Sequence, residues 1–149
     1  MLLAVDFGSA RVGVAACDRE RILAYPVETL PAGDGVPQRL ARLASDYGAV
    51  GVVVGYPLAL DGGAGPAAAN VREQALAVAR AVALPVWLVD ERMTTAEAQK
   101  RLRQAGRTVK TSRKIVDRQA AVGILEAVLN AWNRGSWIGQ ALEMEETDG

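Results

Sequence analysis

The 149-residue sequence contains no histidine and only one cysteine, Cys17. Without an imidazole, catalysis by a Ser-His or Cys-His pair is excluded, and a single cysteine cannot form an internal disulfide. We interpret Cys17 as a small buried apolar residue. Any bound metal must be held mainly by oxygen ligands, which favours Mg²⁺ or Mn²⁺ over Zn²⁺.

Aromatic residues are scarce, at 5% of the chain, and no apolar run approaches the roughly 18 residues of a membrane span. The short apolar run at the start is not preceded by the basic residues of a signal peptide. We therefore expect a cytoplasmic protein without membrane contact. Half of the residues are hydrophobic, mostly Ala, Val and Leu, which is typical of one alternating α/β domain.

The formal net charge is zero, but the charges are unevenly distributed. Residues 143–149 hold four acids and no base, whereas residues 100–118 hold eight basic residues and one acid. We predict a single domain over residues 1–138 and an acidic, flexible tail over residues 139–149. A basic run most often marks a solvated helix face, but it also suits phosphate contacts.

Apolar runs and turn residues predict a mixed sheet with helices on its faces. Pro26 favours an edge position or an irregularity in its strand, because proline cannot donate to a ladder. Gly48 and Gly106 are expected to end helices. Strands are expected at residues 2–5, 12–16, 22–30, 49–55 and 86–89, and helices at 38–47, 67–82, about 94–105 and 114–132.

Acidic residues recur at the ends of the predicted elements. Asp6 follows the first strand, Asp90 and Glu91 follow the strand at 86–89, and Asp117 lies near the start of the last helix. Each acid alone is readily explained as a turn former, a cap or a favourable charge at a helix start. Because acids occur at the ends of three predicted elements in one chain, we hypothesise that they form one site.

Three neighbouring carboxylates repel one another unless their pKa values rise or a divalent cation binds between them. Two such ions about 4 Å apart can activate a water and stabilise the leaving oxygen in phosphodiester cleavage. The pattern therefore favours a nuclease. Arg11 and Arg92 are expected to contact phosphates, although each could equally neutralise the candidate acid beside it. The full set of expected phosphate contacts is Arg11, Arg92, Lys110, Arg113 and Lys114.

Four stretches, in this order along the chain, resemble the YqgF family of bacterial proteins. They are residues 6–15 (DFGSARVGVA), 54–58 (VGYPL) with Asp61-Gly62, 90–95 (DERMTT) and 116–121 (VDRQAA). That family is also called RuvX and belongs to the ribonuclease-H-like superfamily. The resemblance covers residues 1 to about 129. Tyr56 departs from the usual apolar residue there. Residues 107–112, which we expect to form a polar basic loop, are less lysine-rich than in many members.

The resemblance implies an α/β ribonuclease-H-like fold with a central mixed five-stranded sheet whose first three strands are antiparallel. It also implies cleavage dependent on Mg²⁺ or Mn²⁺, with the catalytic positions at Asp6, Asp90, Glu91 and Asp117. Of these, Asp6, Glu91 and Asp117 are the expected metal ligands, with Asp90 the alternative to Glu91. The implied substrate is nucleic acid, either structured RNA in a ribosome precursor, through 5′-end maturation of 16S rRNA, or branched DNA.

Two other functions fit parts of the pattern. Residues 6–9 also resemble the first phosphate loop of actin-like kinases and ATPases, but those proteins need two facing domains and this chain has room for one. A non-catalytic nucleic-acid-binding or ribosome-assembly factor would use the same basic residues. Every candidate acid is present, however, which argues against a loss of catalytic activity. The residues leave open whether the chain is a monomer or a homodimer.

Overall fold

The computed structural model describes residues 1–8, 10–57, 63, 65–91 and 109–142, and for residues 109–119 the backbone alone. The strands are β1 (Leu2–Phe7), β2 (Arg11–Cys17), β3 (Ala24–Pro31), β4 (Gly51–Tyr56), β5 (Val86–Asp90) and β6 (Gln140–Ala141), and the helices are α1 (Val36–Tyr47), α2 (Pro66–Val82) and α4 (Val109–Asn133).

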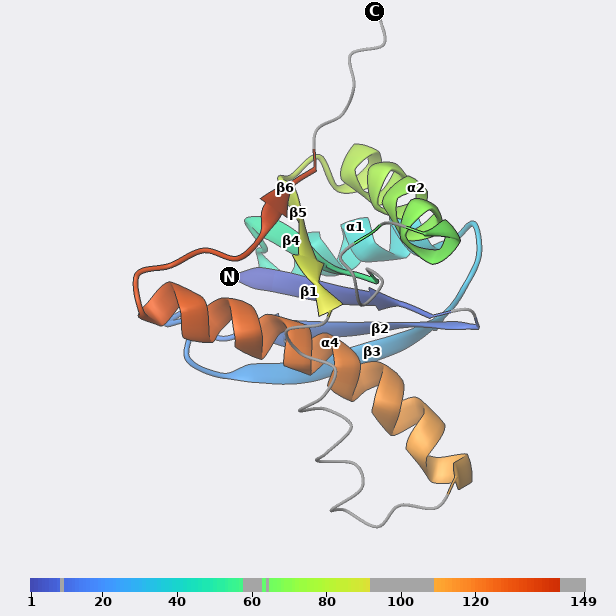
Figure 1. The fold of residues 1–149 in the computed structure, drawn as a ribbon, viewed down its shortest axis with the longest axis horizontal. Coiled ribbons are helices and arrows are strands. Elements are labelled where there is room, and N and C mark those ends of the chain that lie inside the picture. The colour runs from blue at the N-terminus through green and yellow to red at the C-terminus, as the bar shows by residue number, and fades with distance from the viewer. Residues whose placement is uncertain (9, 58–62, 64, 92–108, 143–149) are drawn as a thin grey trace, which may run out of the picture.

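These strands form one mixed sheet in the order β3-β2-β1-β4-β5-β6 (Figure 1). β1, β2 and β3 are antiparallel to one another, whereas β4 and β5 run parallel to β1. The α/β fold class and the antiparallel first three strands are therefore confirmed, as is the edge position of the strand that contains Pro26.

The sheet has six strands rather than the expected five, because residues 140–141 form a short strand antiparallel to β5. Leu142 follows it and is buried, and its backbone N–H donates to the carbonyl of Val86 at 2.9 Å. Residues 140–142 therefore belong to the fold, and the remainder of the expected acidic tail lies outside the described residues. A two-residue strand has no periodicity, so the sequence pattern did not reveal it.

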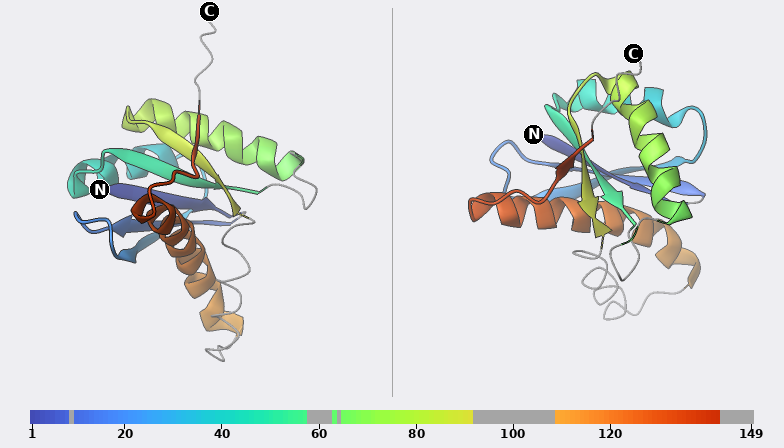
Figure 2. Two further views of the ribbon diagram at one scale, coloured as in Figure 1. Left: turned by 60° about the vertical axis from the view of Figure 1, so that its left-hand side comes forward. Right: turned by 45° about the horizontal axis from the view of Figure 1, so that its top comes forward.

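Two layers of helices cover the sheet (Figure 2). α1 and α2 pack on one face, over alternating strand residues that include Leu3, Val5 and Val54. α4 packs on the other face, over Leu2, Ala4 and Val53. Because successive strand side chains point to opposite faces, this division fixes which strand residues face α4.

Local sequence signals determine where the helices end. α1 ends at Gly48, which adopts a left-handed conformation with a φ of 66°, as expected for a glycine C-cap. α2 starts at Pro66 and ends at Ala83, a non-glycine residue with a φ of 56°. α4 starts at Val109, so residues 109–112, expected to form a loop, are helical. The predicted helix at about 94–105 lies outside the described residues.

Within the part of the chain that the structure describes, no helix combines the length and apolarity that crossing a bilayer requires.

Candidate active site

Asp6 lies on the face of the sheet covered by α4. It follows Leu2 and Ala4 at two-residue spacing in β1, and both of those residues pack beneath α4. The neighbouring strands place glycines beside it, because Asp6 pairs with Gly13 of β2 and the β1–β4 register continues to Gly55. Asp6 therefore has no side chain directly beside it on either neighbouring strand.

Glu91 follows the end of β5 and contacts this carboxyl group. The two side chains share a hydrogen bond, and the pKa of Asp6 is raised from its ordinary value of 3.8 to about 8. Burial is the main cause of the shift, and the hydrogen bond and negative charge of Glu91 add to it. At neutral pH the Asp6 carboxyl group therefore keeps its proton and is the donor in this hydrogen bond.

Gly55 provides the space that Glu91 occupies. A Cβ atom at residue 55 would lie 2.8 Å from Oε1 of Glu91 and 2.5 Å from Cδ1 of Ile124 in α4. The Glu91 carboxylate thus lies against the β4 backbone, between the sheet and the helix. Residue 55 appears in the sequence only as part of an apolar strand, so its contribution to the site was not predicted.

The two members of the acidic pair point to opposite faces. Asp90 ends β5 and follows Val86 and Leu88 at two-residue spacing, and those two residues pack on the α1–α2 face. Asp90 therefore projects away from Asp6, whereas Glu91 reaches it. Geometry favours Glu91 over Asp90 as the partner of Asp6.

The structure covers the remaining predicted site residues unevenly. Asp117 lies within α4, as do Lys110, Arg113 and Lys114, but their side chains lie outside the description, and Arg92 lies outside it altogether. Across the described residues, no group of three or more acidic or cysteine side chains could hold a metal ion. The described part of the site is therefore the pair Asp6 and Glu91.

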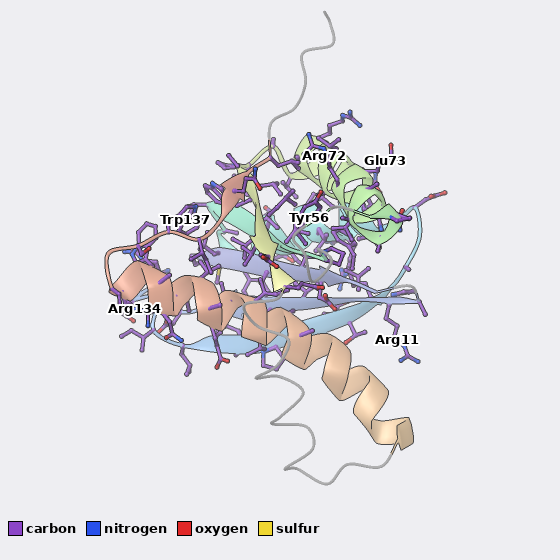
Figure 3. The ribbon with its side chains drawn as sticks, in the orientation of Figure 1. Arg11, Tyr56, Arg72, Glu73, Arg134 and Trp137 are labelled. Carbon is purple, nitrogen blue, oxygen red and sulfur yellow. The ribbon has the colours of Figure 1, made fainter. Side chains whose placement is uncertain are left out.

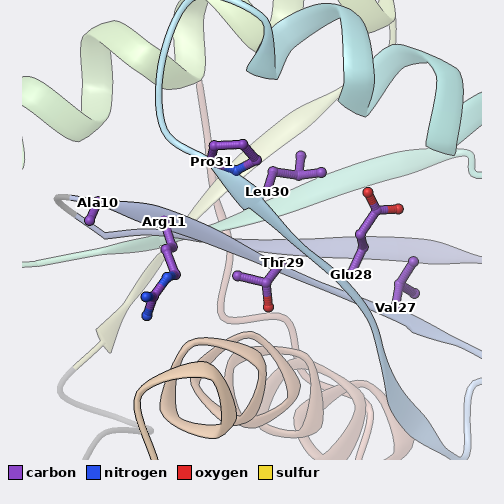
Figure 4. A pocket seen from close by; sticks show the side chains of 7 residues that line it. All are labelled: Ala10, Arg11, Val27, Glu28, Thr29, Leu30 and Pro31. Carbon is purple, nitrogen blue, oxygen red and sulfur yellow. The ribbon is translucent and has the colours of Figure 1, made fainter. Parts of the chain in front are cut away.

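Arg11 and Thr29 extend the site toward the edge of the sheet. Thr29 of β3 pairs with Gly13, which pairs with Asp6, so these three positions form one row across the sheet. Arg11 and Thr29 both point toward α4 and line a pocket of about 460 Å³ (Figure 4). Arg11 was a predicted phosphate contact. Thr29 was not predicted, because only the β2–β3 register places it in the row of Asp6, two strands away.

The chemistry of this pair suits a hard divalent cation. Two carboxyl groups in contact, one of them half-buried with a raised pKa, form a site in which a cation can replace the shared proton. All candidate donors are oxygen atoms, and Gly55 leaves the space beside β4 that the Glu91 carboxylate occupies. The residues therefore fit a magnesium-type or manganese-type ion.

A mixed sheet of this topology, with acids at the ends of two parallel strands, is the sheet of a ribonuclease-H-like fold. The structure of Thermus thermophilus RuvC matches it with a TM-score of 0.55 and 14% identity, over 95% of this chain and 99% of that chain. T. thermophilus RuvC in complex with Holliday junction substrate matches with the same score and identity, over 93% and 99% of the respective chains.

The chain belongs to the RuvX family, described as Holliday junction resolvase, whose model matches residues 1–131. A relative from Streptomyces coelicolor, named "Putative pre-16S rRNA nuclease", is 50% identical over 87% of this chain and 79% of its own length. A relative of the same name from Cutibacterium acnes is 48% identical over 85% and 80%. The family resemblance is thus confirmed, and the chain is a nuclease, a hydrolase of phosphodiester bonds.

Proposed function

We propose that this chain is a divalent-metal-dependent nuclease that trims the 5′ end of the 16S rRNA precursor. The observation that carries the proposal is the half-buried carboxyl pair of Asp6 and Glu91, whose mutual repulsion a divalent cation would relieve. The names of relatives that are about half identical to this chain support the choice of substrate.

Asp6 and Glu91 would hold Mg²⁺ or Mn²⁺, and such an ion supplies an activated water and stabilises the leaving oxygen. Asp6 gives up its proton to become a ligand. Gly55 keeps Glu91 against the strand, and Arg11 contacts a backbone phosphate of the substrate.

Asp117 is the third ligand in this proposal. It lies seven residues before Ile124, which is two turns along the same stripe of α4. Ile124 contacts the sheet at Gly55, beside Glu91. The backbone position of Asp117 thus supports its assignment to the site, as does the position of Asp117 in the fourth of the motifs shared with the family.

The test compares cleavage of a labelled 5′ segment of the 16S precursor by the wild type and by Asp6→Asn and Glu91→Gln. Each substitution removes several kcal/mol of transition-state stabilisation, so we expect the rate to fall by about 1,000-fold or more. Asp46→Asn, an exposed acid at the far end of α1, is the matched control and should cut at the wild-type rate. Asp90→Asn should lose far less activity than Glu91→Gln.

A four-way DNA junction is the second substrate, because the family description and the RuvC fold favour branched DNA. Faster cutting of the junction than of the RNA, dependent on Asp6, would replace the rRNA proposal with a resolvase. If the wild type binds both substrates and cuts neither with Mg²⁺ or Mn²⁺, the chain is a binding factor. Full activity of Asp6→Asn would rule out the proposed site.

A further inference from the structure

The end of the molecule opposite the active site exposes apolar side chains. Across the described residues, the exposed large apolar side chains are Ile22, Leu23, Tyr47, Val50 and Trp132. All of them lie at the end of the sheet where β1 begins, whereas Asp6 lies near the end where β1 finishes (Figure 1). Figure 3 shows the same separation, with Arg134 and Trp137 at one end and Arg11 at the other.

Ile22 and Leu23 are held outward by an ordered turn between β2 and β3. Their side chains are 71% and 63% exposed. Oδ1 of Asp18 accepts the backbone N–H groups of Ile22 at 2.7 Å and of Leu23 at 3.1 Å, and these bonds lower the pKa of Asp18. Arg21 adopts a left-handed conformation with a φ of 59°, which is unfavourable for a residue with a side chain. The turn thus accepts backbone strain while presenting two aliphatic side chains to water.

The turn is also attached to the end of α4. The guanidinium of Arg21 lies 5.0 Å from the ring centre of Trp132, and the side-chain amide of Asn133 donates to the carbonyl of Arg21 at 3.2 Å. Trp132 packs edge-on against Trp137, which packs edge-on against Trp87 of β5. Ile22, Leu23 and Trp132 therefore form one rigid surface supported from the core, and such pre-organisation lowers the entropy cost of binding.

Three exposed arginines border these side chains. We define the distal surface as Arg19, Arg21, Ile22, Leu23, Trp132 and Arg134. Glu20 is the one exposed acid within the 18–23 turn, because the Asp18 carboxylate accepts backbone N–H groups. An apolar centre with arginines at its rim complements a protein segment that carries apolar residues flanked by Asp or Glu.

Two other occupants fit this surface less well. Nucleic acid would need the Trp132 ring and the arginines, but the Arg21 guanidinium already lies over that ring. Ile22 and Leu23, the most exposed apolar side chains of the surface, offer neither a ring for a base nor a donor for a phosphate. A symmetric pair of chains joined here would bring the arginines of both copies together. It would also leave the two Asp6 sites at the far ends of the pair.

We propose that the distal surface docks a protein of the precursor particle through an apolar segment flanked by carboxylates, while the opposite end reaches the RNA. This inference rests on the proposed rRNA function. Docking at this end leaves Asp6 and Glu91 uncovered, so the partner acts as a tether that raises the local concentration of the nuclease at its substrate.

The test uses purified small-subunit precursor particles and the same RNA stripped of protein. The variant Ile22→Asp/Leu23→Asp should bind the particles at least tenfold more weakly and cut them correspondingly more slowly. It should cut the stripped RNA within twofold of the wild-type rate, because the changed residues are exposed and distant from Asp6. Ala69→Asp/Asn70→Asp adds the same charge at exposed positions of α2 and should match the wild type in both assays.

Arg19→Glu/Arg21→Glu should also weaken particle binding, because these arginines would contact the carboxylates that flank the partner's apolar segment. Unchanged binding by Ile22→Asp/Leu23→Asp, or equal losses on particles and stripped RNA, would overturn the proposal. A wild-type dimer that this variant dissociates would show that a second copy occupies the surface instead. If the wild type cuts neither substrate, the proposed function fails, but sedimentation with the particles still reports on docking.

Discussion

The pKa of Asp6 makes the active site a source of instability when no metal is bound. The folded protein keeps the Asp6 proton up to about pH 8, whereas an unfolded chain loses it near 3.8. Between these values the folded state binds more protons, so the free energy of unfolding falls as pH rises. The stabilising contribution is complete below pH 3.8 and is lost by about pH 8.

Asp6→Asn removes this ionisable group and should stabilise the metal-free protein. At pH 8 we expect the free energy of unfolding to rise by several kcal/mol, measured as an increase in Tm by thermal denaturation in EDTA. At pH 5 the gain should be much smaller, because the wild-type carboxyl group is then neutral. Asp34→Asn, an exposed acid, serves as the control, and equal shifts for Asp6→Asn at both pH values would contradict the raised pKa.

Two glycines of β4 separate stability from activity. A Cβ atom at residue 55 meets Ile124 and Glu91, whereas one at residue 51 meets the ring of Trp87, which lies away from the acids. Gly55→Ala should therefore cost about 1–3 kcal/mol of stability and also displace Glu91, which reduces cleavage at least as much as Glu91→Gln. Gly51→Ala should cost about 1–3 kcal/mol and keep its activity at low temperature. Urea denaturation measures the stability of the two variants, and cleavage rates measure their activity. Cleavage by Gly55→Ala at least as fast as by Gly51→Ala would show that Gly55 has no role in the site.

At the scale of residues, the sequence showed which acids to consider but not how they are arranged. Asp6 and the pair Asp90-Glu91 stand out because each follows a buried strand. The choice within that pair depends on the face to which each side chain points, which follows from the packing of β5. Thr29 lies beside Asp6 only through the register of three strands, and a register between distant segments leaves no local signal.

At the scale of elements, the two long helices of the α1–α2 layer end differently. Both C-caps are left-handed, but α1 has Gly48 there and α2 has Ala83. Ala83→Gly should therefore raise the free energy of unfolding by about 0.5–1 kcal/mol, since glycine adopts this conformation without a steric penalty.

Gly48→Ala provides the reciprocal change and should lower stability by about 1 kcal/mol. A Cβ atom at residue 48 meets no other atom within 4 Å, so the loss would come from the backbone conformation alone. Denaturant titrations measure the free energy of unfolding of Ala83→Gly and Gly48→Ala relative to the wild type. A loss of stability in Ala83→Gly would show that flexibility gained by the unfolded chain outweighs the relieved strain.

Strong local patterns predicted most elements to within a few residues. The apolar run before Asp6 and the β-branched run ending near Gly55 became β1 and β4, and Pro66 and Gly48 marked helix ends as expected. The strand β6 and the helical start of α4 at Val109 were missed. β6 depends on pairing with β5, and residues 109–112 carry the polar and basic composition of a loop, so tertiary context decides both.

At the scale of the whole molecule, the active site and the distal surface lie at opposite ends of one sheet. Binding of a divalent ion at Asp6 should stabilise the entire cooperative domain, by about 2.7 kcal/mol when the free ion is 100-fold above its Kd. The ion competes with the Asp6 proton, so the rise in Tm at a fixed concentration of Mn²⁺ should grow from pH 6 to pH 8.

Asp6→Asn should lose this metal-dependent rise in Tm, whereas Ile22→Asp/Leu23→Asp should keep it in full. The second variant is the control, because substitutions at well-separated sites have independent effects on stability. Comparing the metal-dependent rise in Tm of the two variants therefore tests whether the metal site and the distal surface are independent of each other. An undiminished rise in Asp6→Asn would place the ion elsewhere, and a reduced rise in the distal variant would show that the sheet couples its two ends.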